Sequence, residues 1–324
     1  HVWGVGEALR LMFVITAIAV VALLAFVLGM VWHVDASKMF DITPDGSLGS
    51  SVYFPYGVSG ILASLVFGIW FFLAIEGVPL AAEESANPKK DMPRGIMVAM
   101  GTLVLSGALM LIIVPGTLGA SSAGVSDNPL PEAVRSIYGN NSVLATFVNW
   151  AGLAGLVASF FSIIFAYSRQ LFALSRAGYL PRFLSLTGSK KTPYLALIVP
   201  GTIGFSLAVV TGGNGGILLN VAVFGATVSY VLLNLSHIVL RFKEPQLKRG
   251  YRTPGGAVTT SVALVLALIA VVATFFVDIK AAGIAAGVLM LFIAYFWFYS
   301  RRHLVAKAPE EEFSSISEAE SKLN

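Results

Sequence analysis

A single carboxylate stands inside a long apolar stretch, close to a tryptophan, a glycine and a proline. These residues are Trp70, Glu76, Gly77 and Pro79, within residues 67–79. Proline cannot donate to the helical hydrogen-bond ladder, and its ring clashes with the carbonyl four residues before it. Glycine lowers the cost of leaving the helix, because it adopts backbone angles that other residues avoid. The spacing therefore predicts a helix that breaks near the carboxylate.

A broken helix exposes backbone carbonyls, here those around Ala74 and Ile75. In transporters, unpaired carbonyls at membrane depth coordinate cations, and an ammonium group is a suitable ligand for them. The Trp70 ring adds a cation–π face worth about 0.5–2 kcal/mol. Because Glu76 is costly inside a membrane, a functional role is its default interpretation. We predict a site for a small ammonium-bearing solute, although Pro and Gly are also common in plain membrane helices.

The composition indicates the class of protein that positions these residues. Hydrophobic residues make up 56% of the 324-residue chain and charged residues 12%, whereas soluble domains carry about 25% charged residues. A membrane-crossing helix needs about 20 apolar residues. Eight stretches come near or exceed that length: residues 11–32, 56–82, 96–118, 143–168, 194–211, 217–240, 257–277 and 281–300. We expect an all-α integral membrane protein, with a multi-pass transmembrane domain at residues 1–304 and a polar, disordered tail at residues 305–324.

Basic residues cluster after every second predicted span. The clusters are Lys89, Lys90 and Arg94; Arg169, Arg176, Arg182, Lys190 and Lys191; Arg241, Lys243, Lys248, Arg249 and Arg252; and Arg301, Arg302 and Lys307. Loops retained in the cytoplasm carry the excess of Lys and Arg. We therefore predict that the protein lies in the cytoplasmic (inner) membrane. Both ends of this chain are predicted to face the cytoplasm. The net charge of +4 reflects this topology and does not indicate nucleic-acid binding.

Other functional classes find less support in the residues. The chain has no cysteine and its four histidines do not cluster, so we expect no disulfide, metal or cofactor. A membrane enzyme needs a converging set of catalytic groups, and a channel needs repeated polar rings; no predicted span supplies either. A sensor or scaffold subunit that binds a solute without moving it remains an alternative to a transporter.

Three segments carry a resemblance to a known family. Residues 70–84, followed by Asn-Pro-Lys-Lys-Asp-Met-Pro-Arg at residues 87–94, resemble the sixth helix and next loop of the amino acid-polyamine-organocation permeases. Within that superfamily they most resemble the ethanolamine permeases. Residues 168–181 with 191–193 resemble the loop after the eighth helix, and residues 249–255 the loop before the eleventh. The resemblance covers residues 1 to about 305.

The resemblance implies a secondary active transporter that works by alternating access. Its fold has twelve helices with two inverted five-helix repeats, of which this chain would hold helices five to twelve. We expect a fragment, because the chain opens at His1 and the first four helices, which supply half of the family's substrate site, would be missing. The resemblance implies ethanolamine as the solute, with an amino acid permease or exchanger as the alternative.

The resemblance also assigns roles to individual residues. The family's helix-six aromatic residue falls on Trp70, its amine-coordinating carbonyls on Trp70 and Leu73, and its carboxylate on Glu76. The family's usual glycine is replaced by Ala74, and Gly77 follows the carboxylate instead. The expected substrate site therefore comprises Trp70, Leu73, Ala74, Ile75, Glu76 and Gly77.

The coupling ion is predicted from a different span. Some family members carry a lysine in helix five in place of a sodium ion, but residues 11–32 contain no lysine and Ala19 stands near that place. Sodium-coupled relatives use helix-eight hydroxyls, for which Ser159 and Ser162 are the candidates. Such hydroxyls more often bond to their own backbone or to a neighbouring helix. Coupling to H+ or Na+, exchange and facilitated uptake all stay open.

Overall fold

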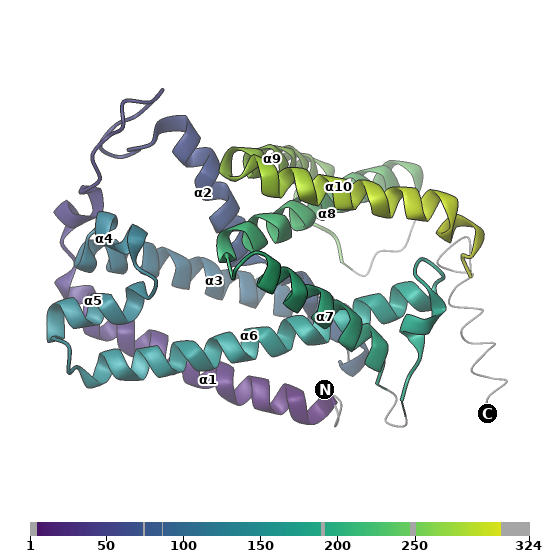
Figure 1. The fold of residues 1–324 in the computed structure, drawn as a ribbon, viewed down its shortest axis with the longest axis horizontal. Helices are drawn as coiled ribbons and strands as arrows, with labels where there is room; N and C mark the ends of the chain where they lie inside the picture. Colours follow the sequence, from purple (N-terminus) through teal and green to yellow (C-terminus); the bar gives the residue numbers. More distant parts are fainter. Residues whose placement is uncertain (1–4, 74, 86, 189–191, 247–250, 306–324) are drawn as a thin grey trace.

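The computed structural model describes residues 5–73, 75–85, 87–188, 192–246 and 251–305 (Figure 1). Within these ranges the chain forms helices and loops, and no strand. The α-helices are α1 Val5–Met30, α2 Gly57–Phe72, α3 Pro88–Leu118, α4 Ala120–Val125, α5 Pro129–Tyr138, α6 Val143–Arg176, α7 Tyr194–Val210, α8 Gly215–Lys243, α9 Gly256–Val277 and α10 Ile279–Phe298. Short 3-10 helices are η1 Val31–His33, η2 Ala36–Phe40, η3 Ile75–Glu84, η4 Arg182–Ser185 and η5 Ser300–Arg302.

The long helices confirm the predicted all-α, multi-pass class. Seven helical stretches in the described part are long and apolar enough to cross a membrane. The remaining predicted span is α7, which has only 17 residues and rises about 26 Å, less than a bilayer core of roughly 30 Å. Pro193 precedes its first turn, and Gly212 and Gly213 follow its last turn with positive φ angles. These residues limit the length of α7, because proline and left-handed glycine both favour helix ends.

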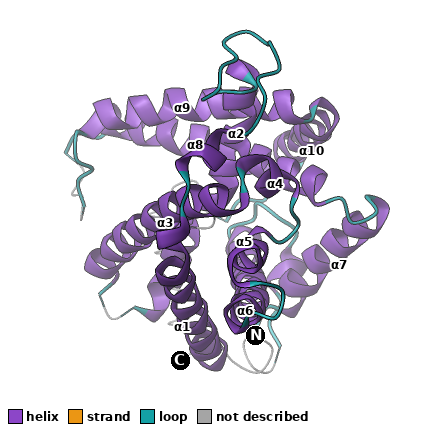
Figure 2. Ribbon diagram, turned by 90° about the vertical axis from the view of Figure 1, so that its left-hand side faces the viewer, coloured by secondary structure: helices purple, strands orange, loops and turns teal. Residues whose placement is uncertain are grey.

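The long helices form two groups that lie one above the other in Figure 2. The α1/α6 group contains α1, α3, α5 and α6, and α7 packs on α6. The α8/α9 group contains α2, α8, α9 and α10. The chain passes from the second group to the first through η3, which contacts α3 and α6. The segment that carries Glu76 therefore lies where the two groups meet.

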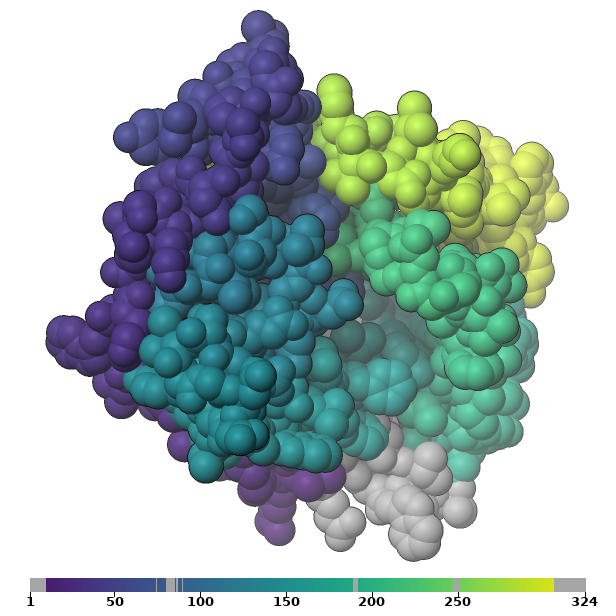
Figure 3. All heavy atoms as spheres, turned by 60° about the vertical axis from the view of Figure 1, so that its left-hand side comes forward, coloured from purple at the N-terminus to yellow at the C-terminus, as the bar shows by residue number. Residues whose placement is uncertain are grey.

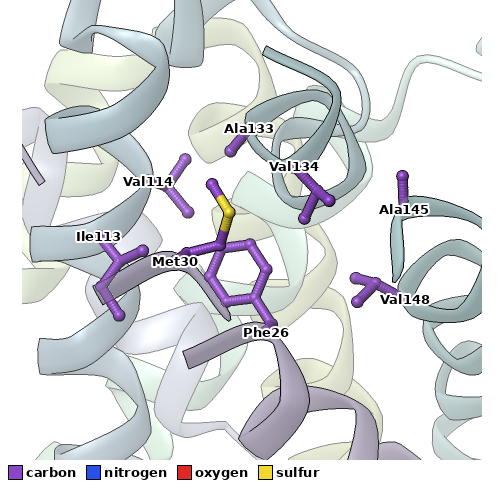
Figure 4. Packing of buried hydrophobic residues seen from close by; sticks show 8 residues of the cluster. All are labelled: Phe26, Met30, Ile113, Val114, Ala133, Val134, Ala145 and Val148. Carbon is purple, nitrogen blue, oxygen red and sulfur yellow. The ribbon is translucent and has the colours of Figure 1, made fainter. Parts of the chain in front are cut away.

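The largest buried cluster belongs to the α1/α6 group (Figure 4). Its members are Phe26, Met30, Ile113, Val114, Ala133, Val134, Ala145 and Val148. Close approach of two helices near this cluster depends on Gly29, since a Cβ added there would lie 2.8 Å from Leu144 Cδ2. Burial of these side chains is the principal attraction that holds α1, α3, α5 and α6 together at this end.

Residues 119–142, which connect two of the predicted spans, contain two short helices. One of them, α5, packs against α1, α3 and α6 and buries Pro131, Ala133 and Val134. The helix starts at Pro129 and ends before Gly139, whose φ angle is +82°. Proline in the first turn and glycine after the last turn are the usual helix boundaries. The segment therefore covers the main core instead of forming an open loop.

The loop before α2 holds α3 and α4 together from outside the spans. Lys38 Nζ donates to the Thr117 carbonyl at 3.1 Å, near the C-terminus of α3. Asp41 accepts hydrogen bonds from Ser121 N–H and Ser121 Oγ, both at 2.8 Å. A cation at a helix C-terminus and an anion at a helix N-terminus are each favourable. The two bonds from Ser121 hold the pKa of Asp41 below its usual value.

Candidate functional site

The helix break predicted from Pro79 is present, and it lies earlier than Gly77. Helix α2 ends at Phe72, and Leu73 has an extended conformation with φ −64° and ψ 152°. The Leu73 N–H donates to the Trp70 carbonyl at 3.2 Å. The chain then continues as the 3-10 helix η3. Pro79 clashes with the carbonyl of Ile75 in a regular α-helix, which explains why α-helical geometry does not extend through this segment.

The predicted substrate residues lie on both sides of this break. Trp70 belongs to the last turn of α2 and its side chain is 42% exposed. Ile75 and Gly77 are partly buried in η3, and Glu76 is exposed. Ala74 lies outside the described residues. The structure therefore places an exposed indole and an exposed carboxylate on opposite sides of the non-helical backbone at Leu73.

Glu76 has a hydrogen-bond partner that the sequence did not indicate. The Tyr230 hydroxyl, on α8, donates to Glu76 Oε1 at 3.0 Å. Asn234, one turn further along α8, donates from Nδ2 to the Tyr230 carbonyl at 2.8 Å. The tyrosine links η3 to the α8/α9 group. The sequence does show a tyrosine within the apolar stretch at residues 217–240, which could have marked a functional position. Its partner, however, depends on how the helices pack.

The neighbour of Trp70 positions the end of α2 against α3. A Cβ added to Gly107 on α3 would lie 2.9 Å from Phe71 Cε1. The Phe71 ring also meets the Phe72 ring edge-on, with 5.2 Å between centroids. A side chain at position 107 would therefore require this ring to move. The last turn before the break is thus held by side-chain packing as well as by helical hydrogen bonds.

The candidate coupling serines lie one turn apart on α6. Ser162 Oγ donates to the Ala158 carbonyl at 3.0 Å, which is the bond expected of a hydroxyl with a purely structural role. Ser159 is exposed. A Cβ added to Gly155, one turn before Ser159, would lie 3.7 Å from the Ala19 side chain. Ala19 of α1, near the place of the family's lysine, therefore lies against α6 one turn before Ser159.

Other polar residues of α8 have structural partners. Asn220 is fully buried, and its Nδ2 donates to the carbonyls of Thr274 and Asp278, both at 3.1 Å. His237 Nδ1 lies 2.8 Å from Thr260 Oγ1. These contacts hold α8 against α9, whereas the Tyr230 hydroxyl contacts Glu76 beside the break.

The loop segments that carry the family resemblance also have local structural roles. Asp91 Oδ2 accepts hydrogen bonds from Ser85 Oγ at 2.8 Å and from Asn87 N–H at 3.2 Å, at the start of α3. After α6, Gly178 has a φ angle of +88°, and a Cβ there would collide with the His303 carbonyl. In the described part of the chain, no group of His, Asp and Glu side chains is suited to hold a metal ion.

Membrane-length helices in two groups, with a broken helix between them, are typical of transporters with discontinuous spans. The chain belongs to the amino acid permease family, whose model matches residues 1–299. Membership of a permease family confirms the expectation that the protein is not an enzyme.

Curated relatives are transporters and permeases. The chain is 31% identical to an uncharacterized transporter of Rhizobium meliloti, over 93% of this chain and 63% of that protein. It is 29% identical to the branched-chain amino acid permease BcaP of Bacillus subtilis, over 78% of this chain and 53% of the relative. It is 26% identical to the methylthioribose transporter of the same organism, over 78% of this chain and 51% of that transporter. The chain thus spans about half to two thirds of the length of these relatives.

Proposed function

We propose that the protein is a secondary transporter that moves a small ammonium-bearing solute across the cytoplasmic membrane. The observation that carries this proposal is the break at Leu73, with Trp70 exposed on one side and Glu76 on the other. Backbone carbonyls beside such a break accept hydrogen bonds from an ammonium group, and an indole face attracts the same charge. Each carbonyl has two lone pairs, so the Trp70 carbonyl retains one for the solute.

The contact between Glu76 and Tyr230 suggests how the site changes during transport. The bond joins η3 to α8 and so links the two helix groups. The surface between the teal atoms near residues 120–150 and the green atoms of the α7–α8 connection is hollowed (Figure 3). In alternating access, helix groups rock against each other around a site at their interface. We propose that this bond forms in one arrangement of the groups and opens in the other.

Ethanolamine is the solute that we propose first, because the run from Trp70 to Glu84 most resembles the ethanolamine permeases. An amino acid is the second candidate, supported by the printed name of a relative, the branched-chain amino acid permease BcaP. The proposed coupling ion is H+ or Na+, with Ser159 and Ser162 as the sodium candidates. The proposed orientation has both ends of this chain in the cytoplasm.

Uptake into proteoliposomes tests these proposals. The complete gene product is reconstituted, and uptake of radiolabelled ethanolamine and, separately, of radiolabelled leucine is measured with and without proton and sodium gradients. Unlabelled ethanolamine, leucine and methylthioribose serve as competitors. Inhibition by ethanolamine alone supports the first assignment, and leucine uptake without competition by ethanolamine supports the second. Binding of a solute without uptake under any gradient would contradict the transporter proposal and favour a sensor.

A further inference from the structure

The ends of α6 and α10 form a junction between two distant parts of the chain. Ser300 Oγ donates to the Tyr179 carbonyl at 2.7 Å. The Val305 N–H donates to the Ala177 carbonyl at 3.1 Å. Both ends are seen together at the right of Figure 1. The loop after α6 and the segment after α10 therefore form one continuous surface, which we call the α6–α10 junction.

Four arginines stand on this junction, and all are exposed. They are Arg176, Arg182, Arg301 and Arg302. Neither residues 169–188 nor residues 295–305 contain Asp or Glu. The transport site at the α2–η3 break uses none of these arginines. Such a concentration of positive charge, in two segments that contain no acidic residue, is suited to an anionic partner.

Exposed aromatic side chains accompany these arginines. The Arg301 guanidinium lies 5.0 Å from the centre of the Trp297 ring, and Trp297 is 61% exposed. The Tyr179 and Phe296 rings stack with 6.0 Å between centroids. Trp and Tyr favour the level of lipid headgroups, and arginine places its charge there while its stem covers apolar surface. An inorganic anion would make no contact with these aromatic rings, whereas the acyl chains of a phospholipid would pack against them.

We propose that the α6–α10 junction binds the headgroup of an anionic phospholipid, with Arg301 and Arg302 contacting the phosphate. Guanidinium groups bind phosphate through paired N–H donors. The acyl chains then lie against the exposed aromatic face of α10, next to Trp297. A lipid held there lies where the ends of α6 and α10 are joined by the Ser300–Tyr179 and Val305–Ala177 hydrogen bonds.

Lipid retention by the purified, delipidated full chain tests this proposal. Native mass spectrometry measures the binding of phosphatidylglycerol and, separately, of phosphatidylcholine in detergent. We expect preferential binding of phosphatidylglycerol and a weakening of about tenfold in the R301Q/R302Q variant, because each basic residue near an anionic lipid adds to the attraction. The R301K/R302K variant should retain most of the binding, which separates loss of charge from misfolding.

The matched control is R135Q/K280Q, which also removes two positive charges but on α5 and at the start of α10, away from the junction. An equal loss of phosphatidylglycerol in this control would overturn the proposal, as would unchanged binding in R301Q/R302Q or equal binding of phosphatidylcholine. Displacement of the lipid by glycerol phosphate at equal concentration would identify a free-anion site instead. If phosphatidylglycerol bound only to a variant truncated after Lys307, the acidic C-terminal segment would be the occupant of the junction, and the lipid proposal would be overturned.

Discussion

The Tyr230 hydroxyl donates a hydrogen bond to Glu76 at 3.0 Å, across 154 positions of sequence. The carboxylate belongs to η3, which contacts α3 and α6, and the tyrosine belongs to α8. The bond therefore links η3, which packs against the α1/α6 group, to the α8/α9 group. It gives the proposed transport mechanism a specific contact that can be removed without altering the apolar packing.

Removal of this contact should impair uptake. We expect Glu76→Gln and Tyr230→Phe each to reduce solute uptake by about tenfold, since a hydrogen bond to a charged group contributes about 1.5–3 kcal/mol. The double variant should lose little more than the worse single variant, because both changes act on the same interaction. Tyr167→Phe is the control, as its hydroxyl bonds to the Leu197 carbonyl on α7. Additive losses would show that the two residues act independently.

Trp70 should determine solute affinity more than turnover. We expect Trp70→Ala to raise the KM of uptake by about 3- to 30-fold, the range that corresponds to a cation–π contact. Trp70→Phe should raise the KM by a smaller factor, because phenylalanine keeps an aromatic face. Trp150→Ala on α6, another exposed tryptophan, should leave KM unchanged. Equal KM values for Trp70→Ala and the native protein would exclude the ring from solute binding.

Gly107 should be required for the packing that precedes the break. Gly107→Ala places a Cβ against the Phe71 ring, and overpacking of this kind costs about 1–3 kcal/mol. Gly101→Ala on the same helix meets no atom within 4 Å and should be neutral or slightly stabilising. Thermal unfolding in detergent compares the two variants. A melting temperature as low for Gly101→Ala as for Gly107→Ala would show that helix flexibility matters more than the contact.

Asp41 should make the segment around α4 sensitive to acid. A carboxyl group whose folded pKa is lowered stabilises the fold above its unfolded pKa, and this contribution is lost as the pH falls through the folded value. We therefore expect faster exchange of the Ser121 amide below the ordinary pKa of 3.8, after correction for intrinsic rates. Asp41→Asn should remove this pH dependence. Asp127→Asn at the same end of the molecule should preserve it.

Membrane orientation can be tested with single cysteines, because the native chain has none. Thr187 and Asn141 are exposed and lie beyond opposite ends of α6. In intact cells, an impermeant thiol reagent should label Asn141→Cys and not Thr187→Cys, if the basic loops are cytoplasmic. Permeabilised cells should label both variants. The reverse pattern in intact cells would invert the proposed topology.

Local residue types were sufficient to predict much of the fold. The apolar stretches at residues 96–118, 143–168 and 257–277 each lie within one helix, namely α3, α6 and α9. A membrane helix satisfies its own backbone and needs only an uninterrupted apolar run. The break in the second stretch was likewise predictable from Pro79, since the clash between proline and the carbonyl four residues before it is a local effect.

Contacts between distant residues required the tertiary structure. Tyr230 as the partner of Glu76, the Phe71 ring over Gly107, and the burial of α5 on three helices were not predictable. Many helix faces in this chain are equally apolar, so composition does not specify which faces meet. That choice depends on how side chains of different sizes interlock between helices, and only the packed arrangement shows it.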